Sequence, residues 1–177
     1  MVSRRSVCLF AGAAVLSPTS VLAQAPTQVP SQALAPPQEK PILAITGKIS
    51  KFNGTKTAVF DRAGLEAIGM SSFETMTPWY KDRVKFEGVP IARLLSLVGA
   101  SGDRLIVTAL NDYTTEIPLT DCAAYNVVLA LKRDGHYMPV ADKGPLFIVY
   151  DFDAHPEIKT QKYYGRSAWQ VARIEIR

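Results

Sequence analysis

Cysteine is scarce in this sequence, which contains only Cys8 and Cys122 in 177 residues. Cys8 lies in a segment that we expect to be removed on export, so the mature chain keeps Cys122 alone. A single thiol cannot form an internal disulfide, and the domain must therefore be stabilised by packing. The sequence identifies no base that would activate Cys122 as a nucleophile, so we interpret it as a small buried apolar residue.

The sequence also lacks a large excess of charge of one sign. Lys and Arg number 20 against 16 Asp and Glu, and the basic residues are interspersed rather than grouped. A basic block, or an alternation of basic and aromatic residues, is typical of nucleic-acid-binding proteins. We therefore predict no nucleic-acid partner.

Several catalytic signatures are missing as well. There is no G-x-S-x-G nucleophile motif, no P-loop and no dinucleotide-binding fingerprint. Residues 151–157 bring acidic side chains close to His155, but without the paired spacing of a zinc-binding helix, so we predict no metal site. The sequence therefore identifies no catalytic residue.

Residues 1–23 have the pattern of a cleaved signal peptide. Arg4 and Arg5 precede an apolar run over residues 7–16, which is shorter than the roughly 20 residues that span a bilayer, and Ala23 ends a cleavage site. The paired arginines loosely resemble a twin-arginine signal, but they are common in ordinary signals and the general secretory route is favoured. We expect a periplasmic or secreted protein with no transmembrane span in the mature chain.

The chain after the signal peptide divides into two parts. Residues 24–41 are rich in Pro, Gln and Ala, which predicts a disordered tether. Residues 42–177 have the length of one ordinary domain with its own core.

Short strands separated by turns dominate the predicted domain. Strands are expected over residues 42–49, 56–60, 71–77, 104–110, 113–117, 127–131, 146–150 and 169–176. Turns are expected at Asn53-Gly54, Asn111-Asp112 and Asp134-Gly135. Asp61 predicts the N-cap of a helix over residues 62–68, a second helix covers residues 91–98, and Asp121 predicts the cap of a brief turn. The class is α+β (mostly β), with two or three small helices.

Three segments together carry a family resemblance. Residues 86–95 read as a strand, a Gly-Val-Pro corner and a helix, and residues 112–119 form an alternating strand. The third segment begins with Gly144-Pro145 and ends with Arg166-Ser167-Ala168-Trp169, which leads into the last predicted strand. In this order they resemble the sulfite-oxidase-type molybdopterin-binding domain over nearly all of residues 42–177. The chain is similar to the small, exported, single-domain branch of that superfamily.

The resemblance implies a molybdopterin cofactor and a cleft that binds it. The catalytic members of the family bind molybdenum through a cysteine thiolate in the first half of the domain, but residues 71–86 contain no cysteine. Positively charged residues of those members are replaced here by Phe147 and Ala168. The expected cleft residues are Trp79, Lys81, Arg83, Lys143, Arg166 and Ser167.

One of these residues, Arg166, has an alternative interpretation. Arg166 and Ser167 can donate to a phosphate or another oxyanion. Arg166 can instead close a loop onto backbone carbonyls or a carboxylate. The neighbouring Trp169 is expected in the core, at the start of a strand.

Two hypotheses for the function follow. The first is an exported oxidoreductase-like domain that binds a pterin cofactor or a small anion in a basic and aromatic cleft. The second is a cofactor-free periplasmic module without redox activity, which senses a small ligand or docks a periplasmic or membrane-bound protein partner.

Overall fold

The computed structural model describes residues 34–177, which contain ten short strands and four short α-helices. The strands and helices confirm the predicted α+β, mostly β class, with more helices than the two or three expected. The predicted signal peptide and residues 24–33 lie outside the described residues.

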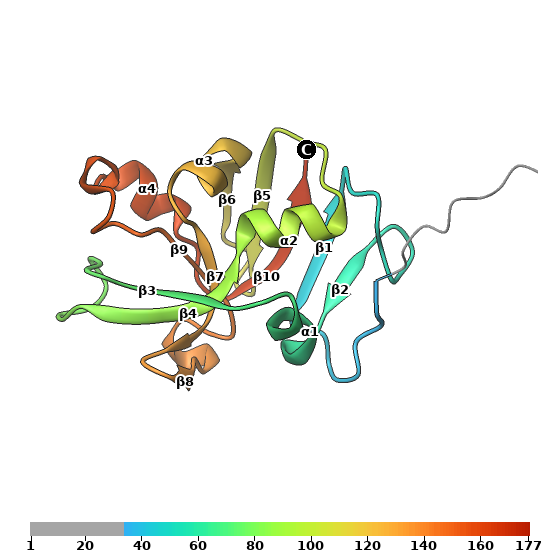
Figure 1. Ribbon diagram of the computed structural model, residues 1–177, viewed down its shortest axis with the longest axis horizontal. Helices are drawn as coiled ribbons and strands as arrows, with labels where there is room; N and C mark the ends of the chain where they lie inside the picture. The colour runs from blue at the N-terminus through green and yellow to red at the C-terminus, as the bar shows by residue number, and fades with distance from the viewer. Residues whose placement is uncertain (1–33) are drawn as a thin grey trace, which may run out of the picture.

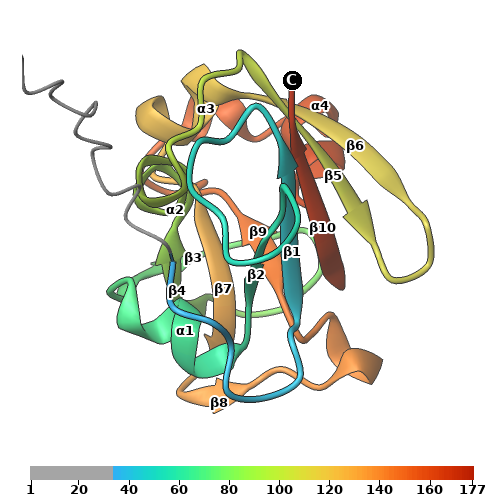
Figure 2. The same cartoon turned by 90° about the vertical axis from the view of Figure 1, so that its right-hand side faces the viewer.

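Five strands form the first sheet, called sheet A here. They are β1 (Leu43–Gly47), β2 (Ala58–Phe60), β5 (Arg104–Ala109), β6 (Thr114–Pro118) and β10 (Val171–Ile176). Their order is β2-β1-β10-β5-β6, and β10 lies parallel to β1 but antiparallel to β5 (Figure 2). The predicted hairpin of β5 and β6 is confirmed.

The other five strands form sheet B. They are β3 (Ser71–Thr75), β4 (Val84–Pro90), β7 (Val128–Arg133), β8 (His136–Tyr137) and β9 (Phe147–Val149). The order is β3-β4-β7-β8, and β9 also pairs with β7. β3 and β4 form a long hairpin that reaches one end of the molecule (Figure 1). The Asp134-Gly135 turn joins β7 to β8, as predicted.

The helices are short and lie between strands. They are α1 (Arg62–Ala67), α2 (Ile91–Val98), α3 (Leu119–Ala124) and α4 (Gln161–Arg166), with 3-10 turns η1 (Val140–Asp142) and η2 (Pro156–Ile158). Asp61 is the N-cap of α1, and its carboxylate accepts a hydrogen bond from the N–H of Gly64. Helix α2 ends at Gly99, which has the left-handed backbone conformation that glycine adopts without strain.

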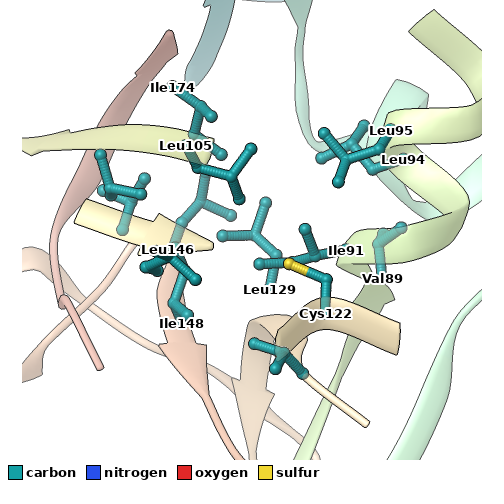
Figure 3. Close-up of a cluster of buried hydrophobic side chains, with 14 of the residues drawn as sticks. Val89, Ile91, Leu94, Leu95, Leu105, Cys122, Leu129, Leu146, Ile148 and Ile174 are labelled. Carbon is teal, nitrogen blue, oxygen red and sulfur yellow. The ribbon is translucent and has the colours of Figure 1, made fainter. Parts of the chain in front are cut away.

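The main core lies between the two sheets and α2 (Figure 3). The predicted apolar face of α2 is buried, with Leu94 fully inaccessible to solvent. Leu105 and Ile174 from sheet A and Leu129 from sheet B reach the same cluster. Burying one such side chain contributes roughly 1.5–3 kcal/mol, so the core stabilises both sheets together.

Residues 34–41, predicted as the end of a disordered tether, lie against the domain. The Asp61 carboxylate accepts hydrogen bonds from the backbone N–H groups of Gln38 (2.7 Å) and Glu39 (2.9 Å). The side chain of Asn53 donates to the carbonyl of Ala35 at 2.7 Å. The packed domain thus includes residues that precede the predicted boundary at residue 42.

Two local predictions need correction. Asn53-Gly54 does not form a tight hairpin turn, because β1 ends at Gly47 and β2 begins only at Ala58. Asn53 instead pairs with the backbone of Val59 in β2, through both its amide nitrogen and its amide oxygen. Asp121 does not cap a turn: it lies inside α3, in the first helical turn, and is buried.

Candidate functional site

A pocket of about 280 Å³ includes residues of the β3–β4 loop and of α4, two segments that lie on the same side of the molecule (Figure 1). It is lined by Trp79, Asn111, Tyr113, Gln161, Tyr164, Gly165, Ser167, Ala168 and Trp169. These residues come from three places: the β3–β4 loop, the β5–β6 loop, and α4 with the segment that follows it. Segments far apart in the sequence therefore form one site.

Trp79 is the central aromatic residue of the pocket. Its ring meets the rings of Trp169 and Tyr164 nearly at right angles, with centroids 5.9 and 6.0 Å away. Behind it, Phe147 of β9 lies 5.4 Å away in an edge-to-face arrangement. Each edge-to-face pair contributes about 0.5–1.5 kcal/mol beyond simple burial, so the walls are fixed by mutual packing.

Polar groups complete the pocket. The Tyr113 hydroxyl donates to the carbonyl of Gly165 at 3.0 Å, which joins the β5–β6 loop to the end of α4. Asn111 and Gln161 are exposed and bring side-chain amides, each with donor and acceptor atoms. The buried Ser167 hydroxyl donates to the carbonyl of Tyr163 at 3.0 Å and so secures the end of α4.

Trp169 is not a core residue, in contrast to the sequence-based expectation. Its side chain is 37% exposed and lines the pocket. The reason is local: Gln170 has a positive φ of 54°, so the regular strand begins only at Val171. The strand alternation that would have turned Trp169 inward therefore does not extend to it.

Two of the six predicted cleft residues, Trp79 and Ser167, line the pocket. Lys143 lies beside it, with its ammonium nitrogen 4.8 Å from the Tyr80 ring centroid and 5.7 Å from that of Trp169. The structure does not bring the remaining cations into the lining. Arg83 forms an ion pair with Asp153 at 2.9 Å, and Lys81 is exposed on the same loop.

Arg166 is engaged in a largely buried ion pair. Its guanidinium donates to the Asp121 carboxylate at 2.6 Å, and only 16% and 8% of the two side chains are exposed. The hydroxyl of Tyr150 donates to the same carboxylate oxygen at 3.1 Å. Burial, together with the nearby Asp121 charge, raises the pKa of Tyr150 well above its ordinary value, so the hydroxyl stays protonated. Of the two roles considered for Arg166, the structure therefore shows the contact with a carboxylate, and this contact holds α4 against α3.

The residues do not fit a molybdenum centre of the usual thiolate-bound kind. Cys122 is the sole cysteine among residues 34–177, and it is buried in the main core rather than in the pocket (Figure 3). Burial and the adjacent Asp121 charge raise the pKa of its thiol to about 12, which disfavours the thiolate that a metal requires. Any pterin held here would need another mode of binding.

Other ionisable groups of the described residues do not gather into a metal site. No group of three or more His, Cys, Asp or Glu side chains is arranged to hold a metal ion within residues 34–177. His155 lies 3.3 Å from Glu157 and packs edge-on against Tyr125. In the same part of the chain, no helix has the length and apolar character needed to cross a membrane.

Sequence reasoning missed seven of the nine lining residues, namely Asn111, Tyr113, Gln161, Tyr164, Gly165, Ala168 and Trp169. The one available signal was the density of aromatic residues over residues 163–169. No model of a known protein family matches the chain, and no curated protein matches it.

Proposed function

We propose that the chain is an exported, cofactor-free binding module that takes a small molecule in its aromatic pocket. The observation that carries the proposal is the convergence of Trp79, Tyr113, Tyr164 and Trp169 on one pocket from three separate segments. A mostly apolar concave site with a few convergent polar groups is the usual form of a small-molecule site.

The composition of the pocket favours binding over catalysis. Among residues 34–177, those that line it include no His, Cys, Asp, Glu, Lys or Arg. These are the side chains that most often transfer protons or act as nucleophiles. Of the lining hydroxyls, that of Ser167 donates to a helix carbonyl and that of Tyr113 to the carbonyl of Gly165, and the described lining residues include no carboxylate or imidazole base.

The resemblance to the sulfite-oxidase-type domain supports a different expectation, an oxidoreductase with molybdopterin. The position of Cys122 weighs against it, since the thiol is in the core. Arg166, for which the resemblance favoured an oxyanion contact, is paired with Asp121. A planar pterin without molybdenum remains compatible with the aromatic walls and belongs among the ligands to test.

Two measurements on protein exported by its own signal test the proposal. Elemental analysis and pterin fluorescence should find neither molybdenum nor pterin at a stoichiometric level in cells that make the cofactor. Ligand-observed NMR with a fragment library should find ligands that bind the wild type and lose binding in the Trp169→Ala variant. Stoichiometric molybdenum, or the absence of any ligand sensitive to that substitution, would refute the proposal.

A further inference from the structure

We infer that the ligand of the aromatic pocket is a neutral sugar, whose ring lies on the aromatic walls and whose hydroxyls pair with the side-chain amides. The inference rests on the proposed binding function and names its ligand class. Three properties of the pocket support it: its lack of charge, its combination of aromatic faces with amides, and its size.

An anionic ligand finds no cation in the pocket wall. Arg166 is held by Asp121 at 2.6 Å, and Arg83 by Asp153 at 2.9 Å. The Lys143 ammonium packs on the Tyr80 and Trp169 rings and does not line the pocket. Anion sites normally direct guanidinium groups or several N–H donors at the ligand, and the lining residues of this pocket do not.

A cationic ligand is matched no better. Aromatic cages for ammonium groups use the open faces of their rings. Here the Lys143 ammonium already contacts the Trp169 ring, and the guanidinium of Arg166 lies 5.2 Å from the centroid of Tyr163, next to the lining residue Tyr164. No carboxylate belongs to the lining that the structure describes. A cationic ligand would therefore bind without a compensating negative charge in the pocket wall.

The pocket is matched to a molecule with one apolar face and a polar edge. Trp169 and Tyr113 both line the pocket, keep 37% and 49% of their surface exposed and offer flat apolar area to a ligand. Asn111 and Gln161 also line the pocket and bring amide groups; the Asn111 amide oxygen already accepts a hydrogen bond from the N–H of Tyr113 at 3.2 Å. A purely apolar ligand would leave the remaining amide donors and acceptors without partners, which is unfavourable. A pyranose ring has a C–H face for the aromatic rings and hydroxyls for the amides.

The size of the pocket agrees with one sugar ring. A volume of about 280 Å³ holds a single six-membered ring with its substituents. It does not hold a dinucleotide or an extended pterin cofactor with its phosphate. Leu110 and Val140 are exposed, and the backbone of each is hydrogen-bonded to Gln170, the residue after the pocket residue Trp169. Their side chains offer apolar surface for a second sugar ring outside the pocket.

Titration calorimetry with the full mature chain tests the inference. The probes are maltose, cellobiose and diacetylchitobiose, with adenosine, AMP, free pterin and choline as comparison ligands. At least one disaccharide should bind, and Trp169→Ala should weaken its binding by about tenfold or more. Gln161→Ala should weaken it by a smaller factor. Phe52→Ala, which removes an exposed aromatic side chain outside the pocket, is the matched control and should change nothing.

The outcomes separate the two proposals. If a comparison ligand binds with the same dependence on Trp169 and no disaccharide binds, the sugar inference is overturned and the binding function stands. If no probe binds in a Trp169-dependent way, the sugar inference also fails, and a negative fragment screen would then remove the binding function itself. Sugar binding that is unaffected by both pocket variants would equally overturn the inference.

Discussion

Arg166 positions the pocket without lining it. Its ion pair with Asp121 joins α4 to α3, and α4 provides Gln161, Tyr164 and Gly165 to the pocket wall. The sequence left two roles open for this arginine, an oxyanion contact or a loop-closing contact with a carboxylate, and it could not show that the buried carboxylate of Asp121, 45 positions earlier, lies within reach.

Replacing Arg166 with Met should destabilise the domain strongly. The substitution leaves the Asp121 carboxylate buried with Tyr150 as its remaining partner, and breaking such a pair costs about 3–5 kcal/mol. Urea denaturation followed by circular dichroism measures the loss. The double variant Arg166→Met/Asp121→Leu, which removes both charges, should recover most of it. A loss below 1 kcal/mol in the single variant would show that the pair contributes little.

The two tryptophans of the pocket should respond differently to truncation. Trp79 packs on Phe147, Phe152, Tyr164 and Trp169, so Trp79→Ala should lower the free energy of unfolding by about 3 kcal/mol or more. Trp169 is 37% exposed, so Trp169→Ala should cost clearly less. Equal losses of unfolding free energy in the two variants would contradict the prediction that Trp79 contributes more to stability than Trp169.

At the scale of single elements, two helix ends were predicted correctly, whereas the Asn53-Gly54 turn and the Asp121 cap were not. Asp61 before an apolar turn and Gly99 after α2 were recognisable as helix ends because caps act on neighbouring residues. Helix α4 was not recognisable, because six residues that include two tyrosines and a glycine have little helix propensity. Its stability comes from packing and from the Arg166–Asp121 pair.

Gly165→Ala should stabilise the domain and weaken ligand binding. Gly165 lies in α4, and a methyl group there would meet no neighbouring atom, so the change removes the helix cost of glycine, about 0.5–1 kcal/mol. Because Gly165 also lines the pocket, a bulkier residue narrows it. Thermal melts and ligand titrations on one sample measure both effects. A less stable variant would contradict the described helix geometry.

Asp61 should make the domain sensitive to acid. Hydrogen bonds from the N–H groups of Glu39 and then Gly64 hold the pKa of Asp61 below its ordinary value of 3.8. The carboxylate's contribution to stability is therefore fully present above pH 3.8 and is lost as the pH falls through the folded-state pKa. Asp61→Asn keeps a capping side chain but does not titrate. The stability difference between wild type and this variant should be constant near neutral pH and shrink in acid. Urea denaturation of both proteins between pH 7 and pH 2.5 measures this difference, and a difference that stays constant in acid would contradict the prediction.

At the scale of the whole molecule, class and core were predictable but topology was not. The alternation of short strands gave the α+β, mostly β class, and helical spacing identified the buried face of α2. The parallel pairing of β1 with β10 joins segments more than 120 positions apart, and no local pattern encodes it. The pocket could not be predicted from the sequence for the same reason, because its three contributing segments are brought together only by the topology of the fold.

Leu94→Ala tests whether one core unites both sheets. Leu94 is fully buried in the cluster that contains residues of both sheets, so its truncation should cost about 2–5 kcal/mol and lower one cooperative transition. Ser96→Ala, on the exposed face of the same helix, should change stability by less than about 0.5 kcal/mol. Two separate unfolding transitions, one for each sheet, would contradict a single core.

The position of β10 also sets the order of events during synthesis. Residues 171–176 fill the gap between β1 and β5, yet they leave the ribosome after every other strand of the two sheets. Until then sheet A exists only as two separate hairpins, which cannot enclose the core between them. The core that the two sheets share therefore cannot close before residues 171–176 have been made.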